Sequence, residues 1–160
     1  MKNGNYINNK IDDDNVLFAF GLKHENEVCK MPMLTLAFIG DAVHALFIKE
    51  YFALSKDYKQ KDLQILVSKV VRAKNQARAL NVVLPELNGD ALDIVRRAKN
   101  AKTNNIPKNA SVSEYHESTA YEALVGYYYL TGKASELKRL LNLTKINKKE
   151  DGKNDWKRNK

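Results

Sequence analysis

The stretch LAFIGDAVHALF, residues 36–47, decides the fold of this chain together with a later stretch, STAYEALVGYYYL, residues 118–130. In both stretches apolar residues recur at steps of three and four, which is the period of an α-helix rather than of a strand. Each stretch carries one acid near its centre, Asp41 in the first and Glu122 in the second. No lysine or arginine lies one helical turn from either acid. The sequence therefore predicts two helices that each carry an unpaired carboxylate on a largely apolar face.

An unpaired carboxylate in such surroundings restricts what the site can be. A buried, unpaired carboxylate costs several kcal/mol, so each acid must find a distant cation, stay protonated, face a water-filled cleft or bind a metal ion. Oxygen ligands suit magnesium or manganese, which keep several waters beside one or two protein carboxylates. Small residues near both acids, Gly40 and Gly126 among them, would let the two helices approach closely. The pattern leaves open both a metal site and simple pairing with remote lysines.

The helical period continues outside these two stretches and predicts an all-α fold. The expected helical segments are residues 34–52, 63–71, 91–101, 114–130 and 135–143. A chain of 160 residues fits one domain, which we place at residues 16–146, between a flexible N-terminus (1–15) and a disordered basic tail (147–160). The polar stretch 102–113 contains Pro107 and has no period, so it is predicted to be a long functional loop.

The charge balance favours a polyanionic partner. The chain has 27 lysines and arginines against 19 acids, for a formal net charge of +8. A mixture of cations and asparagines runs from the end of the 91–101 helix into the loop, which suits phosphate and ribose contacts, although cations also favour helix C-termini. Arg72, Lys74 and Arg78 form a second basic run, for which a solvated face is a simpler interpretation than RNA contact. The cations of the first run are Arg96, Arg97, Lys99, Lys102 and Lys108.

Cysteine content and the first residues indicate the compartment. Cys29 is the only cysteine, which excludes an intramolecular disulfide and a thiolate zinc cluster. The opening MKNGNYINNKIDDD is polar where a secretion signal needs an apolar run, and no later stretch is long and apolar enough to span a bilayer. We therefore expect a cytoplasmic protein without a membrane partner.

We interpret His44 and the tyrosines 127–129 as structural residues rather than as a proton-transfer group and a base-stacking platform.

Two motifs carry a resemblance to a known family. FIGDAV around Asp41 resembles the signature helix of the ribonuclease III family, and the stretch around Glu122 resembles that family's second acidic helix, in the same order and at a similar separation. The basic stretch RRAKNAKTNNIPKN, residues 96–109, is similar to the loop that the Mini-ribonuclease III group carries between these motifs. The resemblance extends over about residues 33–143.

The resemblance implies a ribonuclease III-type endonuclease domain, a helical bundle that forms a two-fold dimer. It implies cleavage of double-stranded RNA by metal-assisted phosphodiester hydrolysis, with Asp41 and Glu122 as catalytic residues and Mg²⁺ ligands, and with Mn²⁺ as a substitute. It places Phe38 at the dimer interface. For this group the expected substrate is precursor 23S ribosomal RNA, with a large-subunit ribosomal protein as an assisting partner.

The sequence also departs from the larger members of the family. Leu34 and Ala37 stand where those enzymes have glutamates, and Thr119 stands where they have an aspartate. The tail after residue 143 is too short to fold as a separate RNA-binding domain, so the catalytic domain itself is expected to hold the RNA. The missing acids support an alternative, a non-catalytic ribonuclease III-like RNA-binding protein in ribosome assembly. Metal-dependent cleavage of duplex RNA distinguishes the two hypotheses.

Overall fold

The computed structural model describes residues 22–102 and 111–145. Across this part of the chain every regular element is helical, so the all-α prediction is confirmed. The predicted flexible N-terminus, the predicted basic tail and Lys108 lie outside the described residues. The elements are α1 (Glu25–Cys29), α2 (Met33–Ser55), α3 (Gln60–Val70), α4 (Ala73–Val83), the 3-10 turn η2 (Leu84–Glu86), α5 (Gly89–Lys99), α6 (Val112–Leu130) and α7 (Ala134–Asn142).

Two unpredicted helices and the early start of α6 are the main differences from the sequence prediction. Helices α1 and α4 were not predicted, α1 because it is only five residues long and α4 because polar residues dilute its apolar period. The predicted loop 102–113 ends too late, since α6 already begins at Val112. A capping box sets this start: the Ser111 hydroxyl accepts from the Glu114 amide at 3.1 Å, and the Glu114 carboxylate accepts from the Ser111 amide at 3.4 Å.

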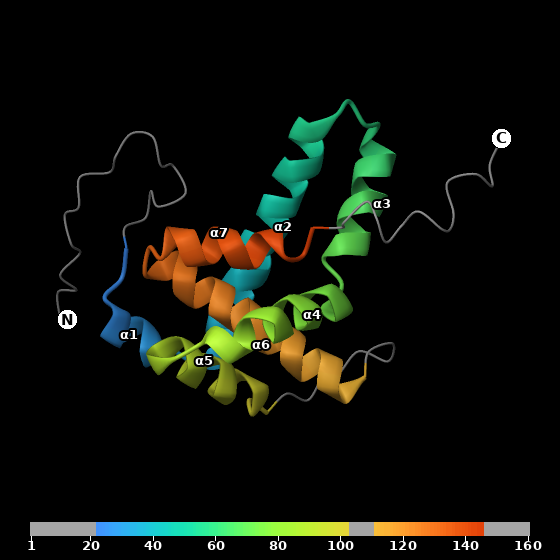
Figure 1. Cartoon of the computed structure of the whole chain (residues 1–160). Helices are drawn as coiled ribbons and strands as arrows, with labels where there is room; N and C mark the ends of the chain where they lie inside the picture. Colours follow the sequence, from blue (N-terminus) through green and yellow to red (C-terminus); the bar gives the residue numbers. More distant parts are fainter. Residues whose placement is uncertain (1–21, 103–110, 146–160) are drawn as a thin grey trace.

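Helix α6 forms the centre of the bundle, and α2 crosses it (Figure 1). Helices α4, α5 and α7 also pack against α6 and bury its remaining apolar surface. Tyr121 and Tyr127, two of the largest fully buried side chains, come from α6. The prediction that the tyrosines are structural is confirmed for Tyr127 and Tyr128, which belong to the main core cluster.

The crossing of α2 and α6 is a contact between backbones. A Cβ atom added to Gly40 would lie 1.8 Å from the carbonyl oxygen of Glu122, and one added to Gly126 would lie 2.2 Å from that of Leu36. No side chain fits at either position without separating the helices. The expected role of these small residues is therefore confirmed, and the crossing point lies directly beside Asp41 and Glu122.

The second half of α2 extends beyond the bundle, and α3 runs back beside it (Figure 1). A small separate cluster of Ile48, Phe52 and Val70 holds this pair of helices together. Helix α2 is thus shared between the main core and the α2–α3 arm. No helix of the described residues is long and apolar enough to cross a membrane.

Candidate active site

The two acids singled out by the sequence come together where α2 and α6 cross. Asp41 follows Gly40 on α2, and Glu122 supplies the carbonyl oxygen that Gly40 approaches. The Asp41 side chain is exposed, whereas Glu122 is half-buried. They are close enough for the negative charge of Asp41 to act on the carboxyl group of Glu122.

The surroundings of Glu122 disfavour its ionised form. Burial raises its pKa from the usual 4.5 to about 7, and the charge of Asp41 adds to this shift. A hydrogen bond from the side chain of Gln76 on α4 acts in the opposite direction and favours the carboxylate. A buried carboxyl group whose pKa is raised by burial and by a neighbouring carboxylate, as for Glu122, marks a candidate functional site. A bound cation would relieve the same repulsion.

The residues present fit one hard divalent cation. Two adjacent carboxylates supply oxygen ligands, and magnesium commonly takes only one or two protein carboxylates beside waters and substrate phosphate. Within residues 22–102 and 111–145 no cluster of three or more acids, histidines or cysteines gathers in a way that could hold a metal. Asp41 and Glu122 are therefore the candidate ligands at this crossing, as an adjacent pair rather than a larger cluster.

Asp41 opens onto a cleft between α2 and α3. The cleft has a volume of about 520 Å³, with Asp41 and Lys49 on the α2 side. Gln60, Gln64 and Ser68 line it from α3 at intervals of four residues, which places them on one face of that helix. The cleft beside Asp41 is therefore lined by a lysine, two amides and a hydroxyl, together with apolar side chains of α2 and α3.

His44 lies beneath the acid pair and is fully buried. Its Nε2 is 2.9 Å from the hydroxyl of Thr144, and its Nδ1 accepts from the amide of Gln76 at 3.2 Å. Burial lowers the pKa of His44 to about 4, so the ring is neutral at physiological pH. The structural interpretation of His44 is confirmed. No pattern in the sequence pointed to Gln76, which lies in the segment interpreted as a basic run.

The predicted RNA-binding cations differ in how far they are free to bind. Arg96 and Lys102 are exposed, and so are Arg72 and Lys74. Arg97 instead donates to the carbonyl oxygen of Cys29 at 2.6 Å and pairs with Asp93 at 3.3 Å, and Lys99 lies 3.9 Å from Glu117.

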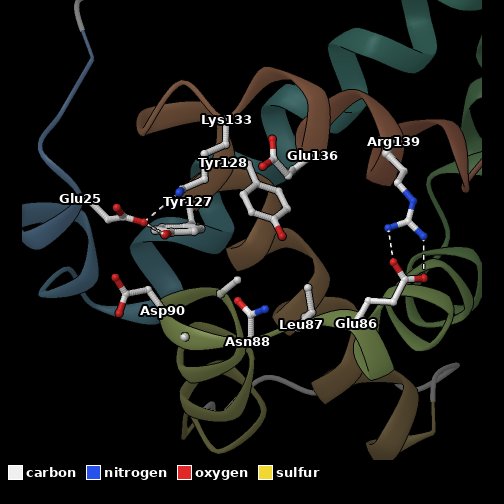
Figure 2. A pocket seen from close by; sticks show the side chains of 12 residues that line it. Glu25, Glu86, Leu87, Asn88, Asp90, Tyr127, Tyr128, Lys133, Glu136 and Arg139 are labelled. Carbon is white, nitrogen blue, oxygen red and sulfur yellow. Dashed lines mark hydrogen bonds and ion pairs between the residues drawn. The ribbon is translucent and has the colours of Figure 1, made fainter.

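A second cavity, of about 280 Å³, lies among α1, α5, α6 and α7. Figure 2 shows that Glu25 accepts from the hydroxyl of Tyr127 and pairs with Lys133 at 3.0 Å. Arg139 donates two hydrogen bonds to Glu86 at 2.6 and 2.7 Å. The Tyr127 hydrogen bond, then Lys133, lowers the pKa of Glu25. These interactions join α1 to α6 and η2 to α7, so the charged side chains around this cavity stabilise the packing of the helices.

The fold and the acid pair define a ribonuclease III-type nuclease. The family model described as Ribonuclease III domain matches residues 34–133, a range that contains both acids. A "Mini-ribonuclease 3" of Symbiobacterium thermophilum is 40% identical over 111 residues, covering 69% of this chain and 85% of that protein. A "Mini-ribonuclease 3-like protein" of Ilyobacter polytropus is 39% identical over 108 residues, covering 68% and 84%.

A solved structure supports the same assignment. The crystal structure of a protein from Fusobacterium nucleatum matches with a TM-score of 0.65 at 37% identity, covering 71% of this chain and 91% of that one. The chain therefore belongs to the Mini-ribonuclease 3 group of the ribonuclease III family.

Proposed function

We propose that this chain is an endoribonuclease that cuts double-stranded RNA with Mg²⁺ held by Asp41 and Glu122. The observation that carries the proposal is the acid pair at the Gly40–Gly126 crossing, where burial and mutual repulsion leave Glu122 in need of a positive partner. The family generally uses divalent metal ions, and Mn²⁺ has the same ligand preference. The products would carry 5′-phosphate and 3′-hydroxyl ends.

Asp41, Glu122 and His44 would have different roles at the metal site. A divalent ion bound there would supply a Lewis acid that activates a water molecule and offsets charge on the phosphate. Asp41, exposed at the cleft, would meet the ion from the solvent side, and half-buried Glu122 would hold it against the bundle. The neutral His44 ring is hydrogen-bonded within the core, so we assign it no proton transfer.

We propose that exposed cations near the bundle hold the RNA backbone. Arg96 and Lys102 at the end of α5, together with Arg72 and Lys74 at the start of α4, project from helices that pack against the helix carrying Glu122. Arg97 and Lys99 would contribute less, because both already contact protein partners. Lys108 keeps its predicted role as an RNA contact. Such contacts fix position on a duplex without reading its sequence.

The proposed reaction predicts cleavage that depends on both metal and duplex. We expect the purified protein to convert a long end-labelled RNA duplex into discrete products with Mg²⁺, and to leave it intact with EDTA. The separated single strands should resist under the same conditions. Denaturing gel electrophoresis measures the products. A duplex that is shifted in a native gel but intact in every lane would contradict the proposal and favour the non-catalytic RNA-binding protein.

We further propose that the enzyme acts as a two-fold dimer with Phe38 at the interface. Phe38 is 80% exposed, and Leu34, one turn earlier on α2, is 43% exposed. Aromatic side chains exposed beside other apolar groups are typical of protein interfaces. A two-fold dimer would present two acid pairs, one for each strand of a duplex.

Phe38→Glu tests this interface. We expect light scattering to show a monomer where the wild type is a dimer, because a charge would be buried in an apolar contact. Cleavage should fall with the loss of the dimer. Leu54→Glu is the matched control, since Leu54 is 85% exposed on the far end of the same helix. A dimer that survives Phe38→Glu but not Leu54→Glu would place the interface at the end of α2 instead.

The biological substrate that we propose is precursor 23S ribosomal RNA in the cytoplasm. The Mini-ribonuclease 3 membership and the net charge of +8 support an RNA substrate. A large-subunit ribosomal protein bound to the same RNA is the proposed assisting partner, because it would hold the duplex in a defined shape. Accumulation of unprocessed precursor in a deletion strain would test this assignment.

A further inference from the structure

Three buried polar side chains form a continuous chain that ends at Glu122. Gln76 is 2% exposed, and His44 and Thr144 are fully buried. They come from α4, from α2 and from the residues after α7. Burying three polar groups beside one another is unfavourable unless each is hydrogen-bonded. The donor and the acceptor in each of these hydrogen bonds therefore determine how the row of side chains acts on Glu122.

The positions of the hydrogen atoms in this row can be deduced by starting from Thr144. The hydroxyl of Thr144 donates its only hydrogen to the carbonyl oxygen of Leu141 at 2.8 Å, so toward His44 it can only accept. The Nε2 of His44, 2.9 Å away, must then carry the ring hydrogen, which leaves Nδ1 as an acceptor. The group that faces Nδ1 at 3.2 Å is the amide nitrogen of Gln76, which is a donor.

The amide nitrogen of Gln76 has a second hydrogen, and the remaining partner is the carboxylate of Glu122. Its two donors thus join the core to the candidate metal ligand. We propose that Gln76 is a positioning residue that fixes the Glu122 carboxylate for cation binding, while His44 and Thr144 hold its amide in place. The proposal rests on the proposed function of Glu122 as a ligand. Thr144 makes the residues after α7 part of the same support.

The physical gain is orientation. A glutamate side chain has three rotatable bonds, and a ligand that is free to turn loses part of its binding energy to ordering. Groups that orient metal ligands in this way typically contribute 10- to 100-fold in metal affinity or activity. Helix α4 would therefore serve the site although it supplies no metal ligand.

Gln76→Met tests the proposal, because methionine keeps the length of the side chain and removes both donors. We expect Mn²⁺ affinity of the RNA-free protein, measured from the electron paramagnetic resonance signal of free Mn²⁺, to fall about 10-fold or more. With duplex RNA, kcat should fall in the same range while KM stays within about twofold, because no RNA contact is removed. Added metal should recover part of the loss.

Asn81→Ala is the matched control. Asn81 also lies on α4 and also donates to a glutamate of α6 at 3.3 Å, but that glutamate is Glu117, more than one helical turn before Glu122. We expect wild-type metal affinity and kcat from this variant. If Gln76→Met does not fold, Thr144→Val takes its place, since valine has the shape of threonine and leaves the Nε2–H of His44 without an acceptor.

The outcomes separate the two proposals. Wild-type metal affinity in a folded Gln76→Met protein, or in Thr144→Val when Gln76→Met is unfolded, would overturn the role of Gln76. A wild-type protein that cuts no duplex would instead overturn the proposed function. The Mn²⁺ measurement contains no RNA, so weaker binding in Gln76→Met would still support the positioning role in that case.

Discussion

Asp41→Asn is expected to reduce kcat for duplex cleavage by about a thousandfold or more. The substitution keeps the shape of the side chain and removes one of the two charges that would hold the cation. Loss of several kcal/mol of transition-state stabilisation corresponds to at least this factor. Because Asp41 is exposed, the stability and oligomeric state of the Asp41→Asn protein should be unchanged. Single-turnover cleavage with enzyme in excess measures the effect, and an active Asp41→Asn protein would overturn the assignment of the site.

Glu122→Gln is expected to abolish cleavage as well. The stability of this variant relative to the wild type should report the raised pKa of Glu122. The folded-state pKa of Glu122 is raised from 4.5 to about 7, so the folded protein binds this proton more tightly than the unfolded chain. The stability gained from that proton is present at low pH and is lost as the pH rises through about 7. Without metal, Glu122→Gln should therefore melt above the wild type at about pH 8.5 and close to it at about pH 5.

Gly40→Ala is expected to have a large effect on both stability and activity. Helix propensity alone would favour alanine by about 1 kcal/mol. The added Cβ, however, would lie 1.8 Å from the carbonyl oxygen of Glu122, so the two helices must separate. Overpacking of this kind costs about 3 kcal/mol, or a fall in Tm of roughly 10 °C for a domain of this size. Chemical denaturation and differential scanning calorimetry measure it.

The same substitution should lower kcat by about a hundredfold in the fraction that remains folded, since displacement of catalytic groups by about 1 Å has that effect. Ala53→Val is the control, because Ala53 is exposed on α2 beyond the crossing. It should change Tm and kcat little. A Gly40→Ala protein as stable and as active as the wild type would show that backbone contact at the crossing is not required.

The acid pair could be predicted because its signal is local. An acid without a cation one turn away, on an otherwise apolar helix, is visible in a window of a few residues, and both Asp41 and Glu122 met that description. The close approach at Gly40 and Gly126 was predicted for a similar reason. Most helices were also predicted, because their apolar periods are long.

Gln76 could not be predicted, because its role depends on tertiary contacts. It lies 35 residues after Asp41 and 46 before Glu122, as the numbering shows. Its neighbours Lys74 and Arg78 made the segment appear to be a solvated basic face, although Gln76 itself is buried. The pairing of Arg97 with Cys29 and Asp93 was hidden in the same way, since the sequence alone shows only a cation at a helix end.

The backbone contact between α2 and α6 limits how this enzyme can be modified. The distance between the two helix backbones beside the acids is set by main-chain contact at Gly40 and Gly126, so exchanging neighbouring side chains cannot bring the helices closer. Engineering that aims at a different metal or a faster enzyme should therefore act on the groups around the carboxylates. Directed evolution of this scaffold would be expected to leave both glycines untouched and to collect its substitutions along the α2–α3 cleft.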